Sequence, residues 1–482
     1  MEVMGEESIQ KAHSHSIKVP RVYKSAAGIL AAHLRGEGSI KDLVYSQVSK
    51  NRHPRMNAIF ALASEAAKNE VLLTHLFSLT GLIENEHPLD PNLAKVLASE
   101  LLWGKGLSNA GNSKPVVTLR GYENKLKLNA DSEDICKTRV NSKSKIPRYV
   151  RINLLKASNT DRVLSTLKTD GYHEVAYERK STSYLQFVDM ANNLTINNFL
   201  IDYHFKDLLA FGAGTTFFDN KLYNEGTLVL QDKASSLAVE ALDLPPGAFV
   251  LDACAAPGMK TLQAMTKINI CGGKNKGRMI AIERDVKRCK TLRSLMQKFG
   301  ADNIQIHNTD FLDLNPNEFA EVEYILLDPS CSGSGIFHRS GQAEKEDSAE
   351  RIEKLASFQT KLLRHALSFP SIKRVAYSTC SVHKRENEDV AMEILHGSGN
   401  FEPVKSFALK NNCLPEWERR GLSEYGDEAN SFIRSKPVDD LGIGFFVAIF
   451  ERIVSQTNLN QTSKKRKHDK IAGPVAKKLN VS

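Results

Sequence analysis

The chain lacks the features of membrane, secreted and zinc-binding proteins. Its 482 residues include no run of about 18 apolar residues, the length that spans a bilayer as a helix. The N-terminus, MEVMGEESIQKAHSHS, has acidic residues and no apolar core, so we expect no secretory signal peptide. The 7 cysteines are scattered and contain no C-x-x-C pair. This pattern argues against a disulfide framework or a metal site and favours free thiols in a reducing compartment.

Positive charge is in excess, and much of it lies near the C-terminus. The formal net charge of +9 and the pI of about 9.0 permit a polyanionic partner without requiring one. Lys464 to Lys470, KKRKHDK, and then Lys477-Lys478 lie in a tail that is poor in apolar residues. Such a tail, here 455–482, is either a solvated, disordered end or a nuclear import signal or nucleic-acid-binding arm.

The first half of the chain divides by composition into three segments. Helical periodicity over Ala26 to Gly106 predicts a helical N-terminal domain, 22–107. Residues 108–146 are rich in Ser, Asn and Lys and are expected to form a linker. PRYVRINLL reads as a strand and DRVLSTLKTDGY as a helix, which predicts a small α+β domain over 147–225.

The remaining domain, 226–454, shows a regular alternation of strands and helices. The short apolar runs are AFVLDAC, MIAIE, IQIHNTD, YILLDPS and RVAYSTC, and helix-like stretches such as KRCKTLRSLMQKFG separate them. This alternation is typical of an α/β, doubly wound, mostly parallel sheet with helices on both faces. GFFVAIFER, Gly444 to Arg452, is expected to be a final strand.

Acidic residues follow four successive predicted strands, at Asp252, Glu283, Asp310 and Asp328. One such acid is an ordinary turn or cap, but four favour a ligand site, because ligands bind outside the carboxyl ends of parallel strands. The first loop, DACAAPGMKT, is neither G-x-G-x-x-G nor a P-loop, so it does not suit a pyrophosphate. A positively charged nucleoside without phosphates suits this acidic rim, and S-adenosylmethionine is such a ligand.

Two cysteines occupy equivalent places, since Cys331 and Cys380 each follow a short apolar run. Either they are small apolar residues where strands happen to end, or two thiols face one site. Reactive thiols must be ionisable and reachable, which a strand end allows and a core position does not.

Three long motifs, LVLQDKASSLAVEALDLPPGAFVLDACAAPGMKT, ILLDPSCSGSG and VAYSTCSVHKRENE, resemble in order and spacing the Sun family of RNA cytosine-5 methyltransferases. The resemblance covers roughly 147 to 452. The N-terminal GSIKDLVY and LAKVLASELLWGKG resemble the eukaryotic branch that methylates a cytosine in large-subunit rRNA. It implies a Rossmann-like class I methyltransferase domain, a small RNA-binding domain before it, and large-subunit rRNA or pre-ribosomal particles as partners, in the nucleus and nucleolus.

The resemblance also implies roles for individual residues. Cys380 would add to C6 of the cytosine, Cys331 would assist breakdown of the adduct, and Asp328 would bind the cytosine edge. The residues implied in binding S-adenosylmethionine are Cys254, Ala255, Ala256, Pro257, Gly258, Met259, Lys260, Glu283, Asp310 and Asp328. Lys260 can equally be a solvated lysine, and Asn387 and Glu388 receive no role. The family more often has Pro-Pro-Cys where this chain has Pro329-Ser330-Cys331.

Two other function classes remain open. A DNA cytosine-5 methyltransferase would use the Pro-Cys cysteine as nucleophile, and the second cysteine at position 380 argues against it. A ribosome-assembly factor would bind RNA and have dispensable catalysis, and the presence of Cys380, Cys331 and Asp328 argues against loss of activity.

Overall fold

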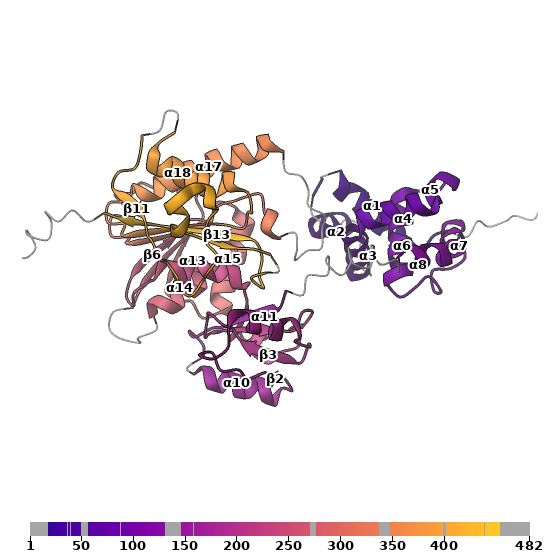
Figure 1. The fold of residues 1–482 in the computed structure, drawn as a ribbon, viewed down its shortest axis with the longest axis horizontal. Coiled ribbons are helices and arrows are strands. Elements are labelled where there is room, and N and C mark those ends of the chain that lie inside the picture. The colour runs from indigo at the N-terminus through magenta and orange to yellow at the C-terminus, as the bar shows by residue number, and fades with distance from the viewer. Residues whose placement is uncertain are drawn as a thin grey trace, which may run out of the picture. The chain divides into compact units, whose positions relative to one another are not determined.

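The computed structural model describes most of the chain (Figure 1). The described residues are 18–35, 37–38, 40–49, 56–86, 88–130, 146–157, 159–269, 276–336, 348–398, 402–437 and 439–453. The basic run from Lys464 to Lys478, on which the import hypothesis rests, lies outside them. None of the described helices combines the length and the apolar character that a bilayer crossing requires. Contacts divide the chain into two compact units, which are described separately.

The first unit is helical. Its helices are α1 (Arg21–Leu34), α2 (Ile40–Ser49), α3 (Met56–Lys68), α4 (Glu70–Thr80), α5 (Leu82–Asn85), α6 (Pro91–Trp103), α7 (Lys114–Gly121) and α8 (Glu123–Ala130). The start of α6 follows from its sequence, because Asp90 accepts a hydrogen bond from the backbone N–H of Leu93 at 2.7 Å and proline occupies the first turn.

The structure corrects the expected linker over 108–146. Helices α7 and α8 lie within it and pack on the rest of the unit through three fully buried side chains, Val116, Leu119 and Leu126. The composition was misleading because these few apolar residues are enough to bury one face of a short helix, while polar residues between them, such as Asn124 and Lys125, face solvent. The helical unit therefore continues to Ala130.

The second unit begins with a five-stranded sheet. Its strands are β1 (Arg148–Ile152), β2 (His173–Glu174), β3 (Asn198–Ile201), β4 (Leu208–Phe211) and β5 (Leu228–Leu230), in the order β2-β3-β4-β1-β5. Helices α10 (Thr160–Thr169), α11 (Tyr184–Asn192) and α12 (Lys221–Asn224) complete this α+β part. The strand and helix predicted from PRYVRINLL and DRVLSTLKTDGY are confirmed as β1 and α10. The last strand of the sheet, β5, lies a few residues past the expected domain boundary at 225.

The larger part of this unit is an eight-stranded sheet. Five strands are parallel: β6 (Phe249–Asp252), β7 (Arg278–Ile282), β8 (Ile304–His307), β9 (Tyr324–Leu327) and β10 (Arg374–Thr379). β13 (Phe445–Arg452) pairs antiparallel with β10, and β11 (Phe407–Leu409) and β12 (Phe432–Ser435) pair antiparallel with β13. The order β11-β13-β10-β9-β6-β7-β8 confirms the doubly wound, mostly parallel α/β fold.

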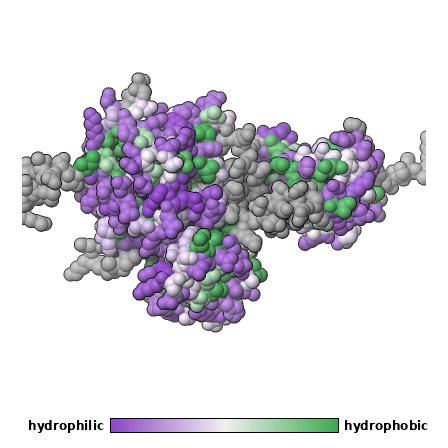
Figure 2. Space-filling model, viewed as in Figure 1, coloured by the Kyte–Doolittle hydropathy of each residue, from purple (hydrophilic) through white to green (hydrophobic). Residues whose placement is uncertain are grey.

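Helices cover both faces of this sheet (Figure 1). α13 (Lys233–Leu242), α14 (Met259–Asn269) and α15 (Val286–Lys298) lie on one face, and α17 (Ala349–Leu367) and α18 (Glu388–His396) on the other. β10 shows why the strands read as continuous apolar runs: Ala376 packs into one core, while Val375 and Tyr377 pack into the other. The visible described surface is mostly hydrophilic, with hydrophobic residues in small separate patches (Figure 2). The apolar runs of the strands therefore supply side chains to the two hydrophobic cores, one on each face of the sheet.

Candidate active site

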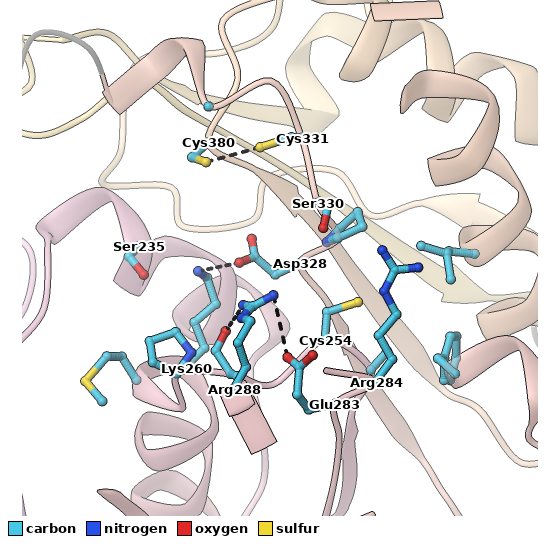
Figure 3. Close-up of a pocket in the computed structure, with 18 of the residues that line it drawn as sticks. Ser235, Cys254, Lys260, Glu283, Arg284, Arg288, Asp328, Ser330, Cys331 and Cys380 are labelled. Carbon is cyan, nitrogen blue, oxygen red and sulfur yellow. Dashed lines mark hydrogen bonds and ion pairs between the residues drawn. The ribbon is translucent and has the colours of Figure 1, made fainter. Parts of the chain in front are cut away.

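The loops that follow the parallel strands meet around one cavity of about 610 Å³ (Figure 3). They meet because parallel strands present all their carboxyl ends at the same edge of the sheet. The predicted site residues that line the cavity are Cys254, Ala256, Pro257, Met259, Lys260, Glu283, Asp310, Asp328, Cys331 and Cys380. Residues that the sequence patterns did not single out, such as Arg284, Arg288, Phe358 and Phe445, complete the wall.

Two of the predicted cofactor residues, Ala255 and Gly258, do not line this cavity. Ala255 is buried, and its N–H donates to the carbonyl of Ile282 at 2.9 Å, which ties the loop to β7. Gly258 has a φ of +112°, and a Cβ there would lie 2.5 Å from Cε of Met296 and 2.7 Å from Cδ1 of Leu292. Glycine is thus required at this position for packing against α15, and a ligand contact is not needed to explain it.

The two cysteines from separate motifs lie side by side, with Cys331 Sγ 3.1 Å from Cys380 Sγ. β9 and β10 are parallel neighbours, and Tyr377 pairs with Leu327, so both cysteines leave the sheet at the same level. Both are free thiols and partly accessible. The alternative that they are unrelated core residues at strand ends is wrong.

The surroundings of the two thiols favour ionisation of Cys380. A hydrogen bond from the thiol of Cys331 lowers the pKa of Cys380, and the ammonium of Lys260 lowers it further, against the effects of burial and of Asp328. The pKa of Cys331 is raised by the hydrogen bond to Cys380 and by burial, and no cation offsets this. Of the two thiols, Cys380 is therefore the one that ionises more readily, with Cys331 as its hydrogen-bond donor.

Asp328 is held at the cavity wall by two donors. Lys260 Nζ lies 2.9 Å from its Oδ2, and the hydroxyl of Ser378 donates to its Oδ1 at 2.7 Å. The ammonium of Lys260 also lies 5.1 Å from the ring centre of Phe445. Although burial lowers the pKa of Lys260, Asp328 raises it above the ordinary value, so the lysine stays charged. Lys260 thus lies in the cavity with a side-chain exposure of 15%, and is not the solvated lysine of the alternative interpretation.

The opposite end of the cavity carries the other predicted acids. Glu283 is 4% exposed; one oxygen accepts from the N–H of Asp285 at 2.9 Å, and the other lies 3.7 Å from Arg288 Nη1. Asp310 accepts from the N–H of Leu312 at 3.0 Å with one oxygen and leaves the other near Arg284, at 3.7 Å. Each acid is therefore anchored through one oxygen and keeps capacity to accept hydrogen bonds with the other.

Asp252 lies behind the loop 254–260 and fixes its position. Its carboxylate is buried and accepts from the Thr261 hydroxyl at 2.7 Å, and burial raises its pKa to about 6. Burial also raises the pKa of Cys254, so this thiol is not ionised and acts as an apolar part of the wall. In the part of the chain that the structure describes, no group of three or more His, Cys, Asp or Glu side chains is arranged to hold a metal ion.

Three buried polar residues, six to eight positions after Cys380, received no role from the sequence. Glu386, Asn387 and Glu388 are all 0% exposed. Asn387 accepts from the Thr379 hydroxyl at 2.5 Å and donates to the carbonyl of Ser381 at 3.0 Å, so it fixes the backbone on both sides of Cys380. The run KRENE looks like a solvated charged segment, and only the packing of α17 and α18 against it shows otherwise.

Comparison with protein-family models gives three matches along the chain. Residues 57–145 match the N-terminal domain, and residues 146–231 the ferredoxin-like domain, of NOL1/NOP2/Sun domain family member 5. Residues 239–450 match the model described as 16S rRNA methyltransferase RsmB/F.

Similar proteins cover nearly the whole chain. A protein of Drosophila melanogaster named 28S rRNA (cytosine-C(5))-methyltransferase is 36% identical over 91% of this chain and 97% of its own length. Its namesake in Mus musculus is 36% identical over 89% and 91%, and the 25S rRNA (cytosine-C(5))-methyltransferase rcm1 of Schizosaccharomyces pombe is 36% identical over 88% and 90%.

Solved structures agree in fold. The crystal structure titled PH0851 matches with a TM-score of 0.60 at 20% identity, over 90% of this chain and 100% of that one. A methyltransferase homolog protein from Pyrococcus horikoshii matches with a TM-score of 0.50 at 20% identity, over 78% of this chain and 99% of that one. At this level of identity the likeness concerns the fold alone.

Proposed function

From the premise that this chain belongs to the Sun family of RNA cytosine-5 methyltransferases, in its large-subunit rRNA branch, we propose that it methylates C5 of a cytosine in large-subunit rRNA, with S-adenosylmethionine as the methyl donor. The relatives that carry this activity in their names match over nearly their full length. Large-subunit rRNA is therefore the substrate that we assign, and the small α+β part is assigned to RNA binding.

One observation carries the proposal most directly: the thiol pair, with its 3.1 Å separation between Cys331 Sγ and Cys380 Sγ, beside the ammonium of Lys260 that lowers the pKa of Cys380. C5 of cytosine is a weak nucleophile while the ring is aromatic. Addition of the Cys380 thiolate to C6 forms a C–S bond and moves the electron pair of the C5–C6 double bond toward C5. The dearomatised ring then reacts at C5, which is why this chemistry needs a thiolate beside the base.

S-adenosylmethionine, when bound, supplies an electrophilic methyl group on a positively charged sulfur. After C5 has taken the methyl group it still carries its proton, which must leave before the adduct can break. When a base such as water takes that proton, the C5–H electron pair reforms the C5–C6 double bond, the C6–S bond breaks and its electron pair returns to the sulfur of Cys380. Cys331, in contact with Cys380, is placed to assist this release.

Asp328 and Lys260 are proposed to act on the edge of the base. When the thiolate adds to C6, negative charge develops on the ring around N3; the ammonium of Lys260 would stabilise this charge, while the Asp328 carboxylate would accept from the N4 amino group and orient the base. Asp328 is fixed by Lys260 and Ser378, so its direction does not have to be set during the reaction. Lys260 serves both residues, since its ammonium also lowers the pKa of Cys380.

The donor set fits S-adenosylmethionine. The volume of about 610 Å³ is in the range of small-molecule sites. Glu283 and Asp310 each keep an oxygen for the hydroxyl and amine donors of a nucleoside, and the remaining acids complement a positive sulfur. The loop 254–260 would hold the amino-acid end, with Ala255 and Gly258 contributing through its shape.

The two other function classes make different demands on this site. A DNA cytosine-5 methyltransferase would need Cys331 as the thiolate, whereas Lys260 favours Cys380. An assembly factor without catalysis would have no need for a thiol pair at hydrogen-bonding distance. We also propose that the protein acts in the nucleus and nucleolus, with the basic run 464–478 as the candidate import signal.

Trapping in cells tests the assignment. Cells that express the tagged protein are fed 5-azacytidine, which blocks adduct breakdown, and the RNA and DNA bound to the denatured protein are sequenced. Large-subunit rRNA should dominate the capture and disappear with Cys380→Ala. Predominant capture of DNA, or of another RNA class, would contradict the proposed substrate.

A further inference from the structure

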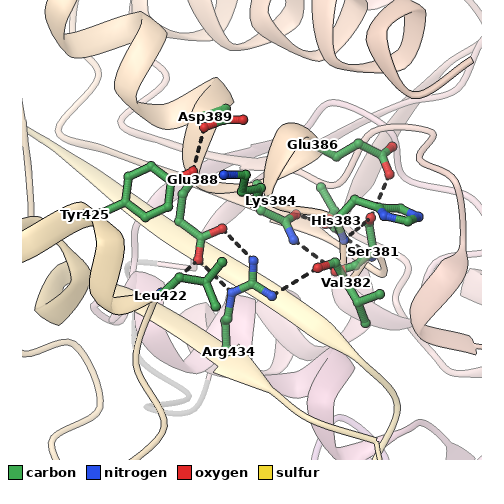
Figure 4. Close-up of polar contacts among 12 residues, drawn as sticks. Ser381, Val382, His383, Lys384, Glu386, Glu388, Asp389, Leu422, Tyr425 and Arg434 are labelled. Carbon is green, nitrogen blue, oxygen red and sulfur yellow. Dashed lines mark hydrogen bonds and ion pairs between the residues drawn. The ribbon is translucent and has the colours of Figure 1, made fainter. Parts of the chain in front are cut away.

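One buried acid, Glu386, which is 0% exposed, binds both of the segments that carry the thiols. Its Oε1 accepts from the backbone N–H of Ser332 at 2.9 Å, and its Oε2 accepts from the hydroxyl of Ser381 at 2.6 Å, a contact drawn in Figure 4. Ser332 directly follows Cys331, and Ser381 directly follows Cys380. A single carboxylate thus binds the residue after each thiol.

The position of this carboxylate is itself fixed by neighbouring elements. Gln359 of α17 donates to Oε1 of Glu386 at 3.0 Å and to the carbonyl of Ser330 at 3.1 Å. The hydroxyl of Tyr377 on β10 donates to the backbone carbonyl of Glu386. The acid is therefore attached to the sheet and to α17, and the thiol segments are attached to the acid.

Hydrogen bonds between serines join the two segments to each other. The hydroxyls of Ser332 and Ser381 are 3.1 Å apart, and that of Ser334 lies 3.2 Å from Ser381. The N–H of Val382 donates to the Ser334 hydroxyl at 3.0 Å, and the N–H of Gly335 donates to the carbonyl of Cys380 at 2.9 Å. Glu386 lies at the centre of this network and accepts three of its hydrogen bonds.

Burial of this carboxylate is costly for the fold. No lysine or arginine in the described part of the chain pairs with Glu386, so neutral donors alone compensate the loss of water. Two of those three donors belong to the residues that follow the thiols. A stability role would be served better by an apolar residue, so the arrangement favours a role in the geometry of the thiols.

We propose that Glu386 is a positioning residue for the thiol pair. By binding the residue after each cysteine, it fixes the separation between the two sulfur atoms, so that Cys331 acts on the adduct that Cys380 forms. This inference rests on the proposed function and adds to it the residue that couples adduct formation to product release. Its essential property is reach: a side chain of glutamate length touches both segments, and one shorter by a methylene does not.

Glu386→Asp and Glu386→Gln separate reach from charge. Glu386→Asp keeps the charge and loses the reach, so the methyl-transfer rate should fall by about 10- to 100-fold, since a misplacement of about 1 Å can cost that much. The amount of RNA adduct resistant to denaturing gels, per methyl group transferred, should rise. Glu386→Gln keeps the reach and one acceptor oxygen, so it should stay close to the wild type on both measures. Both are measured with labelled S-adenosylmethionine on large-subunit rRNA purified from cells that lack the enzyme.

Glu388→Asp is the matched control. Glu388 is also 0% exposed and its carboxylate has three donor contacts, from Arg434 Nε and Nη2 at 2.6 Å each and from the N–H of Leu422 at 3.3 Å (Figure 4). None of these donors comes from the residue after a thiol. Its shortening should lower thermal stability and leave the adduct per methyl group at the wild-type value. An equal rise in both aspartate variants would mean that general loosening, and not the position of Glu386, controls the thiols.

Ser381→Ala gives a second measurement if Glu386→Asp does not fold. It removes one of the three donors to Glu386 and should shift the adduct per methyl group in the same direction, by less. The positioning role would be overturned if Glu386→Asp or Ser381→Ala left the adduct per methyl group at the wild-type value. It would also be overturned if Glu386→Gln and Glu386→Asp lowered the methyl-transfer rate equally. Wild-type protein that transfers no methyl group would instead overturn the proposed function.

Discussion

The thiol pair predicts that alanine variants of the two cysteines differ in whether a covalent protein–RNA adduct accumulates. Cys380→Ala removes the group that attacks C6, so methyl transfer should fall by several orders of magnitude and no covalent complex should form. Cys331→Ala leaves the nucleophile in place but removes the group that assists release. Protein–RNA complexes that survive denaturing gels should therefore accumulate in the Cys331 variant and be absent from the Cys380 variant.

The structure also predicts in which direction the rate of adduct formation changes in the Cys331 variant. The hydrogen bond from Cys331 is the largest influence that lowers the pKa of Cys380, and without it burial and Asp328 remain to raise that pKa. A hydrogen bond to a charged group contributes about 1.5–3 kcal/mol, so its loss should slow adduct formation by up to about 10- to 100-fold. Adduct formation by Cys331→Ala should thus be slower than in the wild type at pH 7 and should recover as the pH rises.

The assay is a time course of adduct on gels, followed by the same time course over a series of pH values. The double variant should behave like Cys380→Ala alone, because there is no adduct for the second substitution to act on. If Cys331→Ala is inert and Cys380→Ala forms adducts, then the nucleophile is Cys331 and the assignment is wrong. If Cys331→Ala forms adduct at the wild-type rate across all pH values, the hydrogen bond between the thiols does not favour ionisation.

Four further predictions concern cofactor binding, the structure of the RNA substrate, nuclear import and RNA affinity. Glu283→Ala or Asp310→Ala should weaken S-adenosylmethionine binding by about 10-fold or more, through loss of a charged acceptor; full affinity of both in calorimetry would remove them from the cofactor site. A cytosine in a fully paired RNA should be methylated more slowly than the same sequence in a loop, because a thiol reaches C6 only of an unpaired or flipped base; equal rates would contradict this. Truncation before Lys464 should reduce nuclear accumulation in fluorescence microscopy; normal localisation of the truncated protein would refute the import hypothesis. RNA binding by the full chain should weaken steeply with salt.

The positions of the site residues along the fold could be predicted from the sequence. Asp252, Glu283, Asp310 and Asp328 lie at or just after the ends of four strands, β6 to β9, which short, largely apolar segments predict. Once the alternation of strands and helices indicates a parallel sheet, all strand ends meet at one edge. This is why two cysteines 49 residues apart could be expected in one site and are in contact.

Only the tertiary structure decided how each of these residues is held. Gly258 was expected to face a cofactor and instead makes room for Met296 and Leu292, because its nearest neighbours come from a helix nearly 40 residues away. The sequence allows Lys260 to be either a solvated lysine or a residue of the site, and only the fold brings Asp328 to 2.9 Å from its ammonium. Helices α7 and α8 read as a linker, since the surface that buries Val116 and Leu119 is supplied by other helices.

Glu386 shows the same limit most clearly. Within KRENE it is one charge among several, and nothing in its immediate sequence distinguishes it from Arg385, whose side chain is partly exposed. Its burial depends on α17, β10 and the two thiol segments arriving at the same point, with Gln359, Ser332 and Ser381 supplying its donors. Local patterns determine which residues a strand or helix turns inward; whether a charge can be buried depends on partners that only the fold brings within hydrogen-bonding distance.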